Sequence, residues 1–229
     1  MIINNELNPV ADWWFEYNDE GCIRFQNHNQ IYDFLLKCQT IAEILAEAEL
    51  FYINHVRFIT WLKLDPNTDD KPHRICKKDT GAMFADYIEP SKLADICFEE
   101  IEKADPLVYP LNIRFYGWGI IIDESENKVK TPSLMSMETI TTGFPVIDIL
   151  TYSDVWLTHD LYGKPQPKLH RLNAPRLQKA LTEVKEALVI DPIIEDNELA
   201  DQHEDFTISN IRDEEGDILI YDPKMQRVV

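Results

Sequence analysis

The chain of 229 residues is 45 % hydrophobic and carries a formal net charge of −19, with a sequence pI of about 4.6. This charge disfavours direct binding to nucleic-acid phosphates or to an anionic membrane, because like charges repel. The apolar runs are far shorter than the roughly 20 residues that span a bilayer, and the first residues lack the pattern of a signal peptide. We therefore expect a globular cytoplasmic protein whose four widely spaced cysteines are reduced.

The negative charge is distributed unevenly along the chain. Residues 191–229 hold 12 acidic and three basic residues, whereas residues 61–190 hold 20 acidic and 16 basic residues. The last 39 residues therefore carry nearly half of the excess, a net −9 against −4 for the much longer middle. Such a surface attracts a basic protein partner and raises its encounter rate.

The first predicted element is a β-hairpin. Aromatic and β-branched residues at 13–17 and 22–25 flank the turn-forming residues 18–21. In this strand Trp14 and Glu16 would share one face, and Trp13, Phe15 and Tyr17 the other.

A helix should follow, then a segment of mixed character and a loop. Apolar residues recur at helical spacing over residues 30–50. Residues 51–64 are richer in aromatic and β-branched side chains, so they could continue the helix or form a strand. The polar residues 65–81 are interpreted as a loop.

The middle of the chain predicts another helix and a sheet. Ser91 is the expected N-cap of a helix over residues 91–104. Strands at 111–123 and 128–140, joined by a turn around Ser125, predict a second hairpin, and residues 144–157 read as a further strand.

The clearest helical pattern covers residues 174–188, with Asn173 as N-cap and Pro175 in the first turn. Its apolar stripe consists of Leu177, Ala180, Leu181, Val184 and Leu188. The acidic residues 193–206 have no periodicity and are interpreted as a linker or a mobile loop. Beyond them, two β-rich runs flank residues 212–216, which predicts a hairpin turn. A calcium loop is disfavoured there, because Gly216 does not stand at the required position.

Together these elements predict a single α+β domain with a mostly antiparallel sheet and three or so helices. Residues 1–190 would form the core. Residues 191–229 would be an acidic linker and a C-terminal hairpin packed on the same domain.

No catalytic constellation stands out. Gly117-Trp118-Gly119 lies within a predicted strand, where a bulge or close packing explains it better than a nucleotide. For His159-Asp160 a surface or structural role is favoured over an acid/base pair, since adjacent side chains of an extended segment point apart. Asp123, Glu126 and Lys128 have the composition of a metal-dependent nuclease core, but they fall in a short turn of a very acidic protein. We expect no enzymatic activity, no cofactor and no structural metal.

Residues 154–181 carry a resemblance to known proteins. Its features are Asp154-x-Trp156, then Asp160-Leu161-x-Gly163-x-Pro165-Gln166-Pro167, then Asn173-Ala174-Pro175-Arg176-Leu177. The segment resembles part of uncharacterised bacterial proteins encoded near secreted toxins. The resemblance implies membership of the immunity proteins, which are cytoplasmic, often acidic and non-enzymatic. Such proteins neutralise polymorphic or contact-dependent toxins by covering the toxin's active site or substrate groove.

The predicted function is therefore binding and blocking of a cognate toxin domain that is basic and nuclease-like. Three alternatives remain open: a nucleic-acid mimic that inhibits a defence nuclease, a secretion chaperone or adaptor, and an unrecognised enzyme. The sequence leaves the oligomeric state open. The candidate partner-binding residues are the carboxylates Glu195, Asp196, Glu198, Asp201, Glu204, Asp205, Asp213, Glu214, Glu215 and Asp217. For these acids the simpler alternative is a solvated linker followed by a turn.

Overall fold

The computed structural model describes residues 9–16, 28–62, 77–83, 86–103, 108–140, 145–194, 196–222 and 227–228. The helices are α1 (His28–Glu47), α2 (Leu93–Lys103) and α3 (Pro167–Leu188), with short 3-10 turns η1 (Pro90–Lys92) and η2 (Asp154–Trp156). The strands are β1 (Ala11–Glu16), β2 (Tyr52–Leu62), β3 (Lys77–Met83), β4 (Val108–Ile122), β5 (Lys128–Ile140), β6 (Val146–Thr151), β7 (Asp201–Gln202), β8 (Ile208–Ser209), β9 (Tyr221–Asp222) and β10 (Arg227–Val228).

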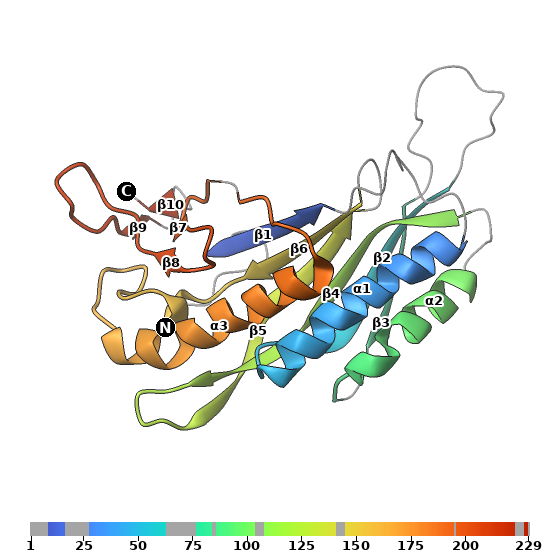
Figure 1. Cartoon of the computed structure of the whole chain (residues 1–229), viewed down its shortest axis with the longest axis horizontal. Coiled ribbons are helices and arrows are strands. Elements are labelled where there is room, and N and C mark those ends of the chain that lie inside the picture. Colours follow the sequence, from blue (N-terminus) through green and yellow to red (C-terminus); the bar gives the residue numbers. More distant parts are fainter. Residues whose placement is uncertain are drawn as a thin grey trace, which may run out of the picture.

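The main sheet has six strands in the order β1-β6-β5-β4-β2-β3, and every neighbouring pair is antiparallel. Helices α1, α2 and α3 lie side by side over one face of this sheet (Figure 1). The predicted α+β class, with an antiparallel sheet and three helices, is confirmed. The two-stranded ribbons β7-β8 and β9-β10 lie beyond β1, at the far end of the molecule from α2 (Figure 1).

Side chains alternate across the sheet and so define its core face. In β1, Trp13 and Phe15 are fully buried, whereas Trp14 and Glu16 are half-exposed on the opposite face. The predicted alternation is therefore confirmed for residues 13–16. The apolar stripe predicted for α3 (Leu177, Ala180, Leu181, Val184, Leu188) packs into the same core.

Two glycines in β4 allow close approach of the first residue of β2 and of the chain just before it. A Cβ atom at Gly117 would lie 2.0 Å from the Tyr52 carbonyl oxygen, and one at Gly119 would lie 2.1 Å from that of Leu50. The pairing register also shifts between Tyr116 and Trp118. Bulging and close packing thus explain the Gly-x-Gly sequence, as predicted.

Several predicted boundaries are wrong. For residues 51–64 the sequence allowed a helix or a strand, and residues 52–62 form the strand β2. The edge strand β3 (Lys77–Met83) begins within the predicted loop 65–81. Ser91 is not a helix cap, because it lies inside the turn η1, whose N-cap is Glu89. The turn and second strand of the first predicted hairpin, and residues 65–76 of the loop, lie outside the described residues.

Helix α3 begins seven residues earlier than predicted. Its first residue is Pro167, so Asn173 lies inside the helix and is fully buried, and Pro175 stands in the helix interior. The helix ends where expected, with Val189 in the left-handed conformation at its C-cap.

The acidic stretch 193–206, predicted to be a linker or mobile loop, contains two paired segments among its described residues. Ile193 exchanges two backbone hydrogen bonds with Trp14, which extends the sheet beyond β1. Residues 201–202 then pair with 208–209 as the β7-β8 hairpin.

Candidate functional site

Most of the segment that carries the resemblance is a structural element with several buried side chains, and we call its residues 154–177 the connector. Asp154 is fully buried, and its carboxylate accepts a hydrogen bond from the Leu161 backbone. The buried Gln166 amide donates to the carbonyl oxygens of Asp154 and Leu157. The Trp156 indole donates to Thr151 Oγ1 at 2.7 Å. These polar side chains satisfy buried backbone and side-chain groups, which explains their presence without a ligand.

Asn173 and Arg176 join α3 to the rest of the molecule. The Asn173 amide donates to the Ile122 carbonyl oxygen and accepts from the Ile122 N–H, both at 2.8 Å. Arg176 donates to the carbonyl oxygens of Ile120 and Ala48, at 2.9 and 2.8 Å. Its cation thereby meets the negative end of the α1 dipole. The Asn and Arg side chains of the Asn-Ala-Pro-Arg sequence thus connect α3 by hydrogen bonds to β4 and to the end of α1.

One turn geometry occurs four times among the residues that the structure describes. The five-residue turns at 123–127, 160–164, 203–207 and 213–217 each close with a hydrogen bond from the first N–H to the fifth carbonyl oxygen. Each has a positive φ at its fourth residue, namely Glu126, Gly163, Phe206 and Gly216. This is the hairpin connection in which a type I turn is followed by a left-handed residue.

In three of these turns the first residue is an aspartate with the same role. Asp123, Asp160 and Asp213 each accept hydrogen bonds from the backbone N–H groups two and four residues ahead, at 2.8–3.0 Å. The Asp123 side chain therefore stabilises its turn. Asp160 has the same structural role, in agreement with the prediction for the His159-Asp160 pair. The predicted turn at 212–216 is confirmed as well, one residue later.

The candidate partner-binding acids lie on two acidic hairpins (residues 201–209 and 212–218) and on the segment before them. Asp196, Glu198, Asp201, Glu204, Asp205, Asp213, Glu214, Glu215 and Asp217 are all exposed, and Glu195 lies outside the described residues. Within the described part of the chain, none of these nine forms an ion pair with lysine or arginine. Hydrogen bonds from Thr207 lower the pKa of Asp205.

The acidic hairpins are fixed to the connector. Asn210, between them, donates to the His159 carbonyl oxygen and accepts from the Thr158 hydroxyl and the His159 N–H, at 3.0–3.1 Å. The Tyr221 N–H donates to the Leu161 carbonyl oxygen at 2.7 Å. Their carboxylates are therefore presented on an ordered scaffold.

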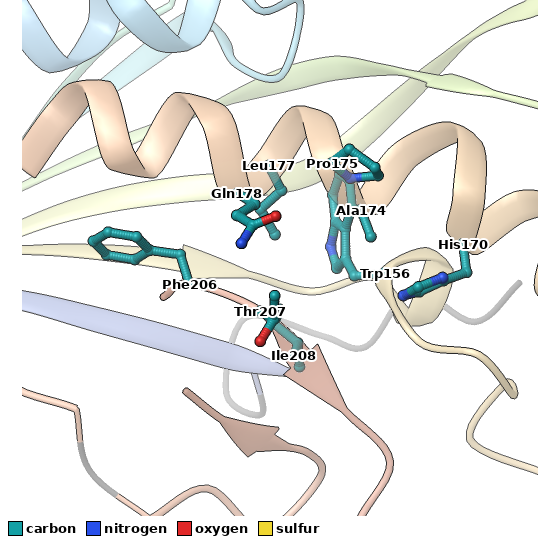
Figure 2. Close-up of a pocket in the computed structure, with 9 residues that line it drawn as sticks. All are labelled: Trp156, His170, Ala174, Pro175, Leu177, Gln178, Phe206, Thr207 and Ile208. Carbon is teal, nitrogen blue, oxygen red and sulfur yellow. The ribbon is translucent and has the colours of Figure 1, made fainter. Parts of the chain in front are cut away.

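A small pocket of about 100 Å³ lies between α3 and the β7-β8 hairpin (Figure 2). It is lined by Trp156, His170, Ala174, Pro175, Leu177, Gln178, Phe206, Thr207 and Ile208. His170 is the one titratable side chain of this lining, and its burial lowers its pKa. The volume is well below the roughly 300–1,000 Å³ of small-molecule sites and suits a single side chain.

Residues of other reactive types are buried or dispersed. Cys38 and Cys97 are buried free thiols, and burial raises the pKa of both, which disfavours the nucleophilic thiolate at neutral pH. Among the described residues, no group of three or more His, Cys, Asp or Glu side chains is placed to hold a metal ion. No helix in the described ranges has the length and apolar character needed to cross a bilayer.

The sheet face opposite the helices carries polar and aromatic side chains, and we call it the open face. Arg57, Arg114, Glu138, Asp148 and Trp14 stand in one register row across β2, β4, β5, β6 and β1, and all are half-buried. Arg114 Nε lies 3.1 Å from Glu138 Oε2, close enough for an ion pair.

Near one end of the open face, aromatic side chains stack. The rings of Tyr52 and Trp118 lie 4.3 Å apart, and Lys130 Nζ lies 3.9 Å from the Trp118 ring. His55 stacks on Tyr116 at 5.5 Å. Sequence reasoning missed this face. Its signal was present as polar residues alternating with apolar ones in β2, β4 and β5, but the strand order that joins them cannot be read from one sequence.

No protein-family model matches the chain, and neither does any curated protein or solved structure.

Proposed function

We propose that the chain is a non-enzymatic bacterial immunity protein that binds and blocks a cognate toxin domain with a basic, nuclease-like surface. The observation that supports this proposal best is the set of nine exposed carboxylates on and beside the acidic hairpins. Carboxylates pair with the lysines and arginines that would otherwise hold substrate phosphates. An acidic inhibitor of this kind also meets a basic toxin rapidly.

The rigid attachment of the acidic hairpins adds to the argument. Binding through a disordered tail would have to order that tail, which lowers affinity. Here Asn210 and Tyr221 hold the hairpins on the connector before any partner arrives. The toxin would then pair with carboxylates that are already in place.

Growth rescue tests the proposal directly. The variable C-terminal domain of a secreted protein encoded next to this chain would be expressed in a heterologous bacterium, with and without the chain. We expect the toxin domain alone to stop growth and the chain to restore it through a complex stable to gel filtration. Failure to restore growth against such neighbouring domains, with the chain expressed and folded, would overturn the proposal.

A charge variant tests the surface. Glu214→Gln/Glu215→Gln/Asp217→Asn removes three exposed charges but keeps Asp213, which the turn needs. Association with the toxin domain should slow about tenfold or more at low ionic strength and lose part of its salt dependence. The matched control, Glu124→Gln/Glu126→Gln/Glu186→Gln, removes three exposed charges elsewhere and should associate like the wild type. Equal rates for both variants would show that these acids are only a turn.

A further inference from the structure

The charges on the open face have an ordered arrangement. Reading across the sheet from β2 to β6, the charged row is Arg57, Arg114, Glu138 and Asp148. The two cations thus occupy adjacent strands on one half, and the two anions occupy the next two strands on the other half. With strands about 4.8 Å apart, the row spans roughly 14 Å.

The sign of the charge reverses across a line that runs along the strands between β4 and β5: both arginines lie on one side of it and both acids on the other. A twofold rotation about that line places a second copy face to face with the first. Arg57 then lies opposite the second copy's Asp148, and Arg114 lies opposite its Glu138. A twofold axis perpendicular to the strands would instead set Arg57 against Arg57 and Asp148 against Asp148, which is repulsive. The charged row therefore favours a twofold axis parallel to the strands over one perpendicular to them.

We propose that the open face is a homodimer interface, in which two copies of this chain pack their sheets face to face through the charged row. The interface is isologous, so each pair of opposite charges occurs twice. The strands of the two sheets cross at about 30°, as in aligned β-sandwiches, because each sheet is twisted.

Neighbouring residues on the open face suit this packing. Ile140 stands next to the axis on β5, two positions from Glu138, and its side chain is 39 % exposed. Val146, its register partner on β6, is half-exposed. These two aliphatic side chains would give the interface an apolar contribution beside the charges.

The net charge of −19 opposes self-association, and the geometry reduces this cost. Residue Ile193 ties the acidic C-terminal segment to the outer edge of β1. Because β1 is far from the axis, the proposed rotation places the two acidic segments at opposite ends of the dimer. The acidic hairpins remain accessible there, so the dimer is independent of the proposed toxin-binding function.

A charge-swap experiment tests the interface. Arg57→Asp and Asp148→Arg are prepared separately and studied by sedimentation velocity at about 0.15 M salt, where long-range repulsion is screened. The wild type should sediment as a dimer of twice 26.8 kDa. Each variant alone sets like charges opposite each other, and its dimer dissociation constant should rise about tenfold or more. An equimolar mixture should dimerise nearly as well as the wild type, because the carboxylate introduced in one variant then faces the guanidinium introduced in the other.

Controls keep the result interpretable. The swaps Lys179→Asp and Glu183→Arg lie on the exposed side of α3 and should leave the dimer unchanged. If a reversed variant unfolds by circular dichroism, the neutral pair Arg57→Gln and Asp148→Asn replaces it, with a weaker loss of dimer expected. A monomeric wild type, unaffected reversed variants, or a mixture that fails to associate would each overturn the proposal.

Discussion

The turns at 160–164 and 213–217 have the same backbone hydrogen bonds but differ in the burial of their first two residues. In both, an aspartate accepts from the N–H groups two and four residues ahead, and a glycine holds a positive φ. Asp160 is 9 % exposed within the connector, whereas all five residues of the second turn are exposed. Among the four acids of residues 213–217, the Asp213 side chain stabilises the turn by accepting two backbone hydrogen bonds. The turn does not require the carboxylates of the other three.

The largest difference between the turns should appear when their first aspartate is removed. Asp160→Ala removes the buried carboxylate that accepts two part-buried backbone hydrogen bonds, so the free energy of unfolding should fall by about 2–3 kcal/mol. In Asp213→Ala water can replace the carboxylate, so a loss of about 1 kcal/mol or less is expected. Urea denaturation measures both. Equal losses would mean that burial does not distinguish the turns.

Substitution of the two glycines should affect both turns alike. Gly163 and Gly216 have φ of +79° and +89°, a conformation that L residues rarely adopt. Gly163→Ala and Gly216→Ala should each lower the free energy of unfolding by about 1–2 kcal/mol. The matched control is Glu126→Gly in the turn 123–127, which should be neutral or stabilising, since Glu126 already has φ of 66°. A neutral Gly216→Ala would contradict the backbone argument.

The exposed acids of the second turn should matter little for folding. Glu214→Gln/Glu215→Gln/Asp217→Asn should change the free energy of unfolding by less than about 0.5 kcal/mol, because exposed charges contribute little. Thermal unfolding at two salt concentrations checks this. A larger loss would assign these carboxylates a structural role and weaken the case for a partner.

The connector, which contains His170, and the acidic hairpin that contains Asp205 should also differ in how their stability depends on pH. Burial lowers the pKa of His170 below its ordinary 6.5, so the unfolded chain binds this proton more readily than the folded protein. The contribution of this group is therefore fully present above pH 6.5 and is lost as the pH falls through the lower folded pKa. The wild type should lose more stability than His170→Gln between pH 7.5 and 5. Parallel pH profiles for the two proteins would contradict this expectation.

For Asp205, on an acidic hairpin, hydrogen bonds from Thr207 lower the pKa instead. Its contribution is present above the ordinary aspartate pKa of about 3.9 and is lost as the pH falls through the folded value. Asp205→Asn should therefore differ from the wild type at neutral pH and converge with it once the pH falls below the lowered pKa of the folded protein. Acid titration followed by circular dichroism measures the convergence. A difference between the two proteins that persists at acid pH would contradict it.

The sequence by itself determined the elements whose signals are local. Alternation placed Trp13 and Phe15 on the core face of β1, and helical spacing identified the buried stripe of α3. The hairpin turns at 123–127 and 213–217 follow from aspartate, glycine and asparagine, whose preferences act within a few residues. The charge surplus of residues 191–229 was likewise visible in the composition.

Only the tertiary structure decided the roles of residues whose partners are distant in sequence. The local sequence around Asn173 resembles a helix N-cap. In the structure its side chain instead forms hydrogen bonds with Ile122, 51 residues away, and the helix begins earlier, at Pro167. The segment 193–206 has no periodicity of its own, and contacts with other elements order it: Ile193 pairs with Trp14 of β1, and Gln178 of α3 donates to the Asp205 carbonyl oxygen. Arg57 and Asp148 belong to one row only because β4 and β5 stand between their strands. Strand order depends on the packing of the whole sheet, and no short stretch of sequence encodes it.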